Sequence, residues 1–521
     1  MPCMKNGKKY FTKISLLAAV MAALFVVTCI AAPCRAQELK KITILYTNDT
    51  HSRLLPFERP DVGKSVGGIE RRAEYFRSVK KREPGVLIVD AGDLCQGTPF
   101  YNFFKGEAEF NSFALAGYDL AAVGNHEFDN GLDNLKLQAE RSGLRLVCAN
   151  LFDSDTLKPL FAPFKIVEIG GVKTAVIGIM GKDSWAAVSN QLKKGVLYAD
   201  EVRLLEKLCA TLDKSVDLIV LLSHSGHEAD LRLAEALPRV DVIIGSHTHT
   251  KLDKPLVVKK TAGRTGSTAI TQAFENGVYA GRLDIYLDGA NRPVRYDGGL
   301  KLIDGGIRIN KRSALHASLS RYENAMKKEI SRKIGVCEAE MSNFVADMFN
   351  ATDHPLGRLV CDAVNSAAGS DVFFSNSTML RDRLPKGDIT IETVYRIIPF
   401  DNTVTVFEMK GDALLGMMDF IAANFGKNES FQYGGISFTI DMKKRKAFDV
   451  KVKGMPVEAG RTYKVATSSY IAQGNLMGSE MFKEVCGRDE LGGNIRDMFA
   501  GYIEKTGSIK PPADERIKLI K

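Results

Sequence analysis

The chain is poor in the residues that mark several common protein classes. Its 521 residues include one tryptophan and nine cysteines, and no two cysteines have the Cys-x-x-Cys spacing of a zinc ribbon or a redox motif. After residue 36 only six widely scattered cysteines remain, which excludes a dense disulfide framework. Internal repeats and long low-complexity tracts are also missing. The composition is otherwise that of a globular protein, and the length predicts two or three domains.

Residues 1–36 differ from the rest of the chain. A lysine-rich start precedes the apolar run ISLLAAVMAALFVV, and small residues ending at Ala36 precede a polar segment. This order is typical of an export signal cleaved near Ala36, and it predicts a periplasmic or extracellular protein. A retained membrane anchor is one alternative, although the run is short for a span of about 20 residues. A lipid anchor on Cys29 is another, although the preceding VVT matches that signal poorly.

Cleavage of the leader would leave little net charge. The segment carries five basic residues and no acidic residue, so its removal lowers the formal net charge from +9 to +4. A charge this small on so long a chain does not indicate a surface that binds nucleic acid polymers. The sequence therefore predicts a partner other than nucleic acid and no stable membrane span after signal cleavage, and it leaves the oligomeric state open.

The pattern of apolar residues divides the remaining chain. From residue 41 to about 290, short runs of valine, isoleucine and leucine alternate with amphipathic stretches, as in a layered α/β core whose strands are covered on both faces. Residues 311–335 are charged, periodic and free of proline, which predicts a linking helix. We therefore expect a signal peptide over 1–36, a first domain over 38–308, a linker helix over 309–338 and a second, smaller α/β domain over 339–521.

Residues that can bind metal ions follow nearly every predicted strand of the first domain. They stand after the apolar runs ITILYT, VLIVD, LAAVG, LIVLLS and VIIG. The residues are Asp49, His51, Asp93, Asn125, His126, Asp129, His224, His247 and His249. Ligand sites of open α/β sheets lie beyond the carboxyl ends of the strands, so we expect these side chains to meet at one edge.

The mixture of imidazole, amide and carboxylate groups suits divalent zinc, manganese, iron or cobalt. The set is too large for one ion, whereas two ions about 3.5–4 Å apart, bridged by an aspartate and a water, would use all of it. Asp93 is the candidate for the bridge. Each motif alone is more often a capped turn or a polar pair, but five of the eight histidines fall at these strand ends.

The same segments resemble a known family. TNDTH, AGDLCQGTPFYNF, VGNHEFDNG, SHSG, GSHTHT and GRLDI follow the order of the calcineurin-like metallophosphoesterases and, more narrowly, of the bacterial 5'-nucleotidase and UDP-sugar hydrolase family. The resemblance runs from about residue 41 to near the C-terminus. It implies an exported α/β protein with a metallophosphoesterase β-sandwich flanked by helices in four layers, followed by a 5'-nucleotidase C-terminal domain that binds substrate.

The resemblance also implies roles for the strand-end residues. One metal would be held by Asp49, His51, Asp93 and His249, and the other by Asp93, Asn125, His224 and His247. Some relatives have an amide at the position of His249. His126 stands where the family has its catalytic histidine, with Asp129 placed to pair with it. Such a pair stabilises charge on the phosphoryl group or protonates the leaving oxygen.

The expected mechanism follows from charge. A phosphate ester is anionic and repels hydroxide, so the site must neutralise the phosphoryl oxygens and supply a nucleophile at neutral pH. Two divalent ions do both, because bound water loses its proton more readily than bulk water. We therefore predict in-line attack by a metal-bound hydroxide, without a phosphoenzyme. Cys95 lies two residues from Asp93 and is expected to be a packing thiol.

For the second domain, the resemblance implies a pocket in which two aromatic rings enclose the base while arginine and asparagine contact phosphate. The residues implied are Asn376, Arg381, Phe400, Asn402 and Tyr470. The segment SNSTMLRD lacks the glycines of the family loop, Leu476 stands where a ribose-binding aspartate is expected, and Asn350 stands where a phosphate-binding arginine is expected. These departures concern substrate selection and leave the metal chemistry unchanged.

Together these features predict an exported dinuclear-metal phosphohydrolase of nucleoside 5'-monophosphates and related nucleotides such as UDP-sugars. Alternatives of the same class are a 2',3'-cyclic-nucleotide phosphodiesterase and a hydrolase of another small phosphorus or sulfur ester. An alternative of another class is a cell-surface ligand-binding protein with an inactive metal site, against which the intact Asn125, His126 and Asp129 argue. The resemblance further implies that the linking helix lets the second domain rotate and carry substrate to the metals.

Overall fold

The structure is a computed structural model. It describes residues 39–520 except 60, 189–191, 213, 261–265, 343–353, 426–430, 475–477, 483–485 and 514–515. The predicted signal peptide, with Cys29 inside it, and the family departures at Asn350 and Leu476 lie outside the described residues. No helix in the described part of the chain has the length and apolarity that a membrane crossing requires.

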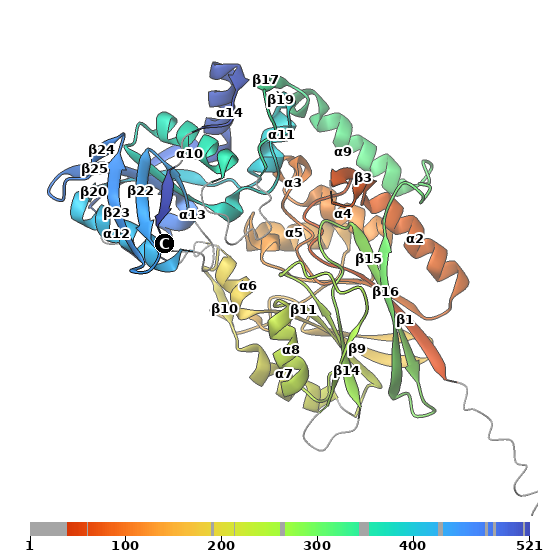
Figure 1. Ribbon diagram of the computed structural model, residues 1–521. Helices are drawn as coiled ribbons and strands as arrows, with labels where there is room; N and C mark the ends of the chain where they lie inside the picture. Colours follow the sequence, from red (N-terminus) through yellow and green to blue (C-terminus); the bar gives the residue numbers. More distant parts are fainter. Residues whose placement is uncertain are drawn as a thin grey trace, which may run out of the picture.

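The first domain contains two six-stranded sheets that face each other (Figure 1). The first sheet has the order β16-β15-β1-β4-β5-β6 and the second the order β13-β14-β12-β11-β9-β8. The strands of the first sheet are β1 (Lys40–Thr47), β4 (Val86–Asp90), β5 (Leu120–Ala122), β6 (Leu146–Val147), β15 (Tyr279–Leu287) and β16 (Pro293–Leu302). Those of the second are β8 (Phe164–Ile169), β9 (Val172–Met180), β11 (Leu218–His224), β12 (Val242–Gly245), β13 (Leu256–Lys259) and β14 (Ser267–Thr271).

Helices cover the outer face of each sheet, which completes four layers. The helices over the first sheet are α2 (Ile69–Arg82), α3 (Pro99–Phe104), α4 (Glu107–Ala116) and α5 (Leu132–Ser142), and those of the other side are α6 (Lys182–Ala187), α7 (Glu201–Leu212) and α8 (His227–Ala236). Along β1, Ile42 and Ile44 pack between the sheets whereas Leu45 packs under the helices. Burial on both faces explains the continuous apolar runs, and the predicted fold class is confirmed.

The polar loops start at one edge of the sandwich because the parallel strands end together. Thr47 at the end of β1 pairs with Asp90 at the end of β4, and Asp90 pairs with Ala121 of β5. In the second sheet, Ser223 of β11 pairs with Gly245 of β12. Two small strand pairs complete the domain, formed by β2 (Phe57–Arg59) with β3 (Gly63–Val66) and by β7 (Leu151–Asp153) with β10 (Val196–Tyr198).

Helix α9 (Ala314–Ile330) lies within the segment predicted as a linker helix. Ser313 caps its N-terminus by accepting a hydrogen bond from the backbone N–H of His316, and its buried residues Leu315, Leu319, Tyr322 and Met326 join the core of the first domain. The helix is shorter than predicted. Residues Lys333–Cys337 instead form strand β17, where Gly335 lies so close to Ile503 that a side chain would not fit.

The second domain is built around a five-stranded sheet of order β21-β18-β25-β20-β26, with one apolar core on each face. Its strands are β18 (Val372–Asn376), β20 (Thr403–Lys410), β21 (Phe431–Gly434), β25 (Thr462–Ser468) and β26 (Cys486–Asn494). Smaller sheets contain β17, β19 (Gly387–Thr390) and β27 (Ser508–Ile509), and β22 (Ile436–Asp441), β23 (Lys446–Val452), β24 (Met455–Pro456) and β28 (Ile517–Ile520). The helices are α10 (Pro355–Ala368), α11 (Ile391–Ile397), α12 (Gly411–Asn424), α13 (Ser469–Ala472) and α14 (Ile495–Thr506).

The two domains touch where α3 of the first faces α11 of the second (Figure 1). The side-chain amide of Asn102 donates a hydrogen bond of 2.8 Å to the carbonyl of Pro399. Lys105 forms an ion pair with Asp401, with 3.1 Å between Nζ and Oδ2. These contacts hold the loop around residue 400 against the edge at which the polar loops of the first domain gather.

Candidate metal centre and substrate cleft

The predicted metal ligands stand in loops with an unusual backbone. The residues Asp49, His51, Asp93, His247 and His249 have φ angles of 47°, 46°, 58°, 75° and 53°. Few residues other than glycine adopt this left-handed region. Each such position costs on the order of 1–3 kcal/mol and is kept where the surroundings determine it, which is common at functional sites. Five of the seven predicted ligands share this property.

Backbone pairing continues past the ends of β1 and β4 and holds two of these loops together. The amide N–H of Asp49 donates to the carbonyl of Gly92 at 2.9 Å, and that of His51 donates to the carbonyl of Asp93 at 3.0 Å. Gly124 lies beside them, and a side chain there would overlap Asp93. The loops after the first two long strands therefore form one rigid unit.

Glu127 ties this unit to the next loop. Its buried carboxylate accepts hydrogen bonds from the backbone N–H groups of Asp93 at 2.9 Å, Cys95 at 3.1 Å and Gly124 at 2.6 Å. Burial and the nearby Asp93 raise the pKa of Glu127 to about 7. Glu127 is not among the predicted site residues, although it directly follows His126 in the sequence. That adjacency is the signal by which it could have been found.

The side chains form three overlapping groups in which the ligand atoms lie within 4.8 Å of one another. The groups are Asp49, His51 and His249; His51, Asp93 and His126; and Asp93, His224 and His247. The Nε2 atoms of His51 and His249 are 3.0 Å apart, and Nε2 of His224 lies 3.3 Å from Oδ2 of Asp93. Asp93 and His51 each belong to two of the three groups.

Asn125 lies inside this cluster as well. Its Oδ1 is 3.1 Å from Nε2 of His224 and 3.1 Å from Nδ1 of His247. The structure therefore brings all seven predicted metal ligands to one edge of the sandwich.

The charges of the cluster favour bound cations. The side chains of Asp49 and Asp93 are almost completely buried. Burial lowers the pKa of a histidine, but at His224 the charges of Asp93 and Asp49 outweigh burial and raise the pKa to about 10. At His247, burial and the charge of His224 lower the pKa to about 3. Two buried carboxylates surrounded by imidazole nitrogens supply the donor types that divalent transition metals prefer.

His126 and Asp129 form a pair at the side of the cluster. The backbone N–H of His126 donates to Oδ1 of Asp93 at 2.9 Å, and Nδ1 of His126 lies 2.8 Å from Oδ2 of Asp129. His126 is the first residue of the short 3-10 turn η1 (His126–Phe128), and Asp129 follows its last residue. The rings of His126 and His51 are 5.4 Å apart. This places the predicted catalytic pair within reach of a group bound at the cluster.

Two predicted residues of the second domain reach the same place. The ring of Phe400 lies 5.9 Å from that of His126, and the guanidinium of Arg381 lies 5.2 Å from the centre of the Phe400 ring. Burial and the charges of neighbouring groups, including Arg381, set the low pKa of His51. An aromatic ring and a cation of the second domain therefore stand beside the metal cluster.

The other predicted substrate residues lie in the second domain. Asn376 ends β18, and its Nδ2 donates to Oγ1 of Thr378 at 2.8 Å in the segment that replaces the family's glycine-rich loop. The carbonyl of Asn402 accepts from the N–H of Ile495 at 3.0 Å. Tyr470 on α13 packs against one apolar core of the domain. Their predicted contacts with substrate remain predictions.

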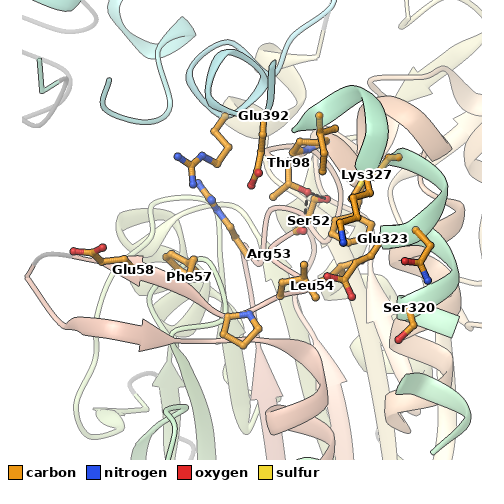
Figure 2. A pocket seen from close by; sticks show the side chains of 18 residues that line it. Ser52, Arg53, Leu54, Phe57, Glu58, Thr98, Ser320, Glu323, Lys327 and Glu392 are labelled. Atoms are coloured by element: carbon orange, nitrogen blue, oxygen red, sulfur yellow. Dashed lines mark hydrogen bonds between the residues drawn. The ribbon is translucent and has the colours of Figure 1, made fainter. Parts of the chain in front are cut away.

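A cavity of about 410 Å³ adjoins the cluster at the junction of the domains (Figure 2). It is lined by the loop 52–58, the start of α3, one side of α9 and Glu392 and Arg396 of α11. Arg53 of the first domain and Arg396 of the second both approach Asp382, at 3.6 and 3.5 Å. The cavity thus lies where the two domains meet, and the predicted ligands do not line it.

Comparison with known proteins agrees with this arrangement. Residues 42–251 match the calcineurin-like phosphoesterase family, and residues 333–484 match the 5'-nucleotidase C-terminal domain. A 5'-nucleotidase of Vibrio cholerae is 29% identical over 90% of this chain and 91% of its own length, and one of Rattus norvegicus is 28% identical over 92% and 90%. The crystal structure of a 5'-nucleotidase precursor from Thermus thermophilus superposes with a TM-score of 0.82, at 28% identity, over 92% of this chain and 99% of that chain.

The sandwich fold, the clustered ligands and these matches define a metal-dependent phosphoester hydrolase. The second matched domain is the 5'-nucleotidase C-terminal domain, and the alignments with the two 5'-nucleotidases cover 90% and 91% of their length. The chain belongs to the 5'-nucleotidase family, as the sequence motifs predict.

Proposed function

We propose that the protein hydrolyses nucleoside 5'-monophosphates, and related nucleotides such as UDP-sugars, to release phosphate or a phosphate monoester. The observation that carries the proposal is the position of Phe400 and Arg381 beside the cluster of the first domain. A flat aromatic ring can stack on a nucleobase, and a guanidinium pairs with phosphoryl oxygens. The names of the relatives support the same substrate class.

The seven clustered residues would hold two divalent ions, zinc, manganese, cobalt or iron. One ion would bind to Asp49, His51, Asp93 and His249, and the other to Asp93, Asn125, His224 and His247. When bound, the ions supply positive charge that neutralises the phosphoryl oxygens and acidifies water. The donor types and the shared Asp93 fit this assignment, with no protein nucleophile needed for attack of water on phosphorus.

His126 would move a proton at the leaving group. With Nδ1 of His126 donating to Asp129, Nε2 can donate toward a phosphoryl or leaving oxygen when the imidazole is protonated. Burial opposes that protonation, but the charges of Asp129 and Asp93 outweigh it and raise the pKa of His126. Arg381 would neutralise a further oxygen while Phe400 orients the base. Asn376, Asn402 and Tyr470 would complete the substrate site, Tyr470 as the second ring.

The proposal includes export to the periplasm or the extracellular space. The basic, apolar and small-residue order of residues 1–36 supports cleavage of a signal peptide near Ala36. The N-terminal sequence and mass of the protein secreted by its own cells test this directly, because a retained anchor or a lipid on Cys29 changes both.

The test of the substrate is a panel assayed on the purified mature protein loaded with manganese or zinc. The panel contains AMP, UDP-glucose, 2',3'-cyclic AMP, an aryl phosphate and an aryl sulfate, and the products are separated and identified. Activity on AMP is expected. Activity on the aryl ester alone would contradict a nucleoside pocket in the second domain, preference for the cyclic or the sulfate ester would indicate the corresponding alternative, and inactivity on every ester would indicate a binding protein.

A further inference from the structure

The outer nitrogens of the clustered histidines have different partners. At His224, Nδ1 faces the backbone carbonyl of Ala91 at 2.9 Å. At His249, Nδ1 faces a carboxylate, with 2.9 Å to Oε2 of Glu275, while Nε2 points into the cluster, 3.0 Å from Nε2 of His51. A carboxylate behind an imidazole fixes its tautomer and ring orientation and makes the inner nitrogen a stronger donor.

Glu275 is itself anchored from a distant part of the chain. Its Oε1 accepts a hydrogen bond of 2.8 Å from Nη1 of Arg59, the last residue of β2. The guanidinium lies 4.5 Å from the centre of the Phe274 ring, and its Nε donates to Asp61 at 3.0 Å. The side chain of Arg59 is 8% exposed. Arg59 therefore has little freedom to leave Glu275.

The loop that carries Glu275 is shaped to direct it at His249. Phe274 and Asn276, its two neighbours, both have left-handed backbones, with φ angles of 68° and 56°. The carbonyl of Phe274 accepts a hydrogen bond of 2.6 Å from the side chain of Asn48, and the N–H of Asn276 donates to the carbonyl of Asp49 at 2.6 Å. The loop is thus fastened to the segment that carries two other predicted ligands. An aromatic residue at positive φ persists only where contacts determine it.

From this arrangement we infer that Arg59 and Glu275 are positioning residues that set the affinity of the metal position formed by Asp49, His51 and His249. The other position does not depend on them. Glu275 orients the His249 ring through Nδ1, and Arg59 acts only through Glu275. The inference rests on the metal ligation in the proposed function and not on the substrate.

The experiment measures metal affinity rather than turnover. Metal-free full-length mature protein is titrated with Co²⁺ or Zn²⁺ in competition with a coloured chelator, which resolves two binding steps. Loss of such an outer partner typically weakens metal binding by about 10- to 100-fold. We expect a loss of this size in one step for Glu275→Ala, a smaller loss for Glu275→Gln, which keeps an acceptor for Nδ1, and no change in the other step.

Glu58→Gln provides the matched control. Glu58 precedes Arg59 on β2 (Figure 2), and successive side chains of a strand point to opposite faces. Its carboxylate approaches Arg383 of the second domain at 3.7 Å. The same change of carboxylate to amide at this position should leave both binding steps as in the wild type. Equal weakening of both steps by Glu275→Ala, or weakening by Glu58→Gln, would overturn the inference.

A double-mutant cycle tests the order of action. Arg59→Gln should weaken the same binding step in the wild type and have no further effect in Glu275→Ala; additive effects would overturn the relay through Glu275. A spectroscopic readout applies to folded Co²⁺-loaded protein. The proton NMR signal of the exchangeable Nδ1 proton of His249 is identified by its loss in His249→Gln. This signal should be visible in the wild type and in Glu58→Gln, and it should be lost by exchange with solvent in Glu275→Ala. Its persistence in Glu275→Ala would also contradict the inference.

These results are separable from the test of substrate. Two binding steps with the predicted selective loss support the inference even if no nucleotide is hydrolysed. Conversely, hydrolysis of AMP with unchanged binding in Glu275→Ala refutes the inference and leaves the proposed function intact.

Discussion

A buried carboxyl of helix α4 provides a direct test of how the metal loop is supported. Glu109 is fully buried, and one of its carboxyl oxygens accepts a hydrogen bond from the hydroxyl of Ser52, the residue that follows His51. The hydroxyl of Ser52 also lies 2.6 Å from that of Thr98. Burial raises the pKa of Glu109 from 4.5 to about 7, and the hydrogen bond from Ser52 opposes this change only in part. The perturbation is Glu109→Gln, which cannot ionise.

The sign and size follow from proton linkage. An acid whose pKa is raised in the folded state contributes stability that is fully present below its unfolded pKa and is lost as the pH rises through the folded value. A tenfold difference in proton affinity between the folded and unfolded states corresponds to about 1.4 kcal/mol, so the rise of the pKa from 4.5 to about 7 corresponds to about 3 kcal/mol. Between about pH 5 and about pH 8 most of this is lost, on the order of 2–3 kcal/mol. Glu109→Gln removes this contribution to the pH dependence. Any constant cost of the buried amide cancels when the free energies of unfolding at the two pH values are subtracted.

The assay is denaturant unfolding of metal-free protein near both pH values, followed by tryptophan fluorescence. The chain has one tryptophan, Trp185, which packs in the first domain against Phe128 with ring centres 5.6 Å apart, so the signal reports the domain that contains Glu109. Glu140→Gln, at an exposed position of α5, should keep the wild-type pH dependence. If Glu109→Gln keeps it too, the carboxyl is not protonated in the folded protein and the reasoning fails.

Four further results are expected. Asp93→Ala should abolish hydrolysis and lower the bound metal found by elemental analysis, since Asp93 belongs to two ligand groups; active wild-type protein without a transition metal would contradict this. His126→Ala should lower kcat by about 10²- to 10⁴-fold with unchanged metal content, and an equal loss of metal would assign it to ligation instead. Phe400→Ala should raise KM for AMP by about 5- to 150-fold if stacking contributes about 1–3 kcal/mol, but not KM for an aryl phosphate; an equal rise for both would refute stacking on the base. A carbodiimide bond between Lys105 and Asp401, whose charged atoms are 3.1 Å apart, should stop multiple turnover if the second domain must rotate, whereas Lys105→Gln treated in the same way should stay active; full turnover of the cross-linked protein would exclude the need for rotation.

The layered fold and the position of the cluster could be predicted because both depend on short-range patterns. Continuous apolar runs such as ITILYT indicate strands that are covered on both faces, and the structure places Ile44 between the sheets and Leu45 under the helices. Parallel strands end at one edge, so polar residues directly after them must gather there. Asp49 and Asp93 are the clearest examples, 44 residues apart in the chain and joined by backbone pairing of their loops.

The supporting residues could not be predicted in this way. Glu275 lies 216 residues from its partner Arg59, and neither stands in a periodic or spaced pattern. A single glutamate in a loop is usually solvated, so only the fold shows that it faces His249. The pattern of charged and apolar residues also did not predict where the linking helix ends. The charged periodic segment continues past Ile330, but close packing at Gly335 selects strand β17 there.

We expect the geometry of the cluster to form on folding and not on metal binding. Five left-handed ligand residues cost several kcal/mol together, and the contacts that compensate are metal-independent. They are the backbone pairing between the loops of Asp49 and Asp93 and the three N–H groups bound by Glu127. Metal sites that lack such support exist only in the loaded protein and unfold when metal is removed. Here the ligand edge belongs to a four-layer domain whose apolar cores are buried whether or not metal is bound. Loss of metal should therefore leave the first domain folded and able to bind ions again. The proposed substrate side is different, because Phe400 and Arg381 reach the cluster through contacts between the domains, among them those of Asn102 with Pro399 and of Arg53 with Asp382. Metal binding and substrate binding are therefore supported by separate parts of the structure, and substitutions that open the domain contact should impair the second without the first.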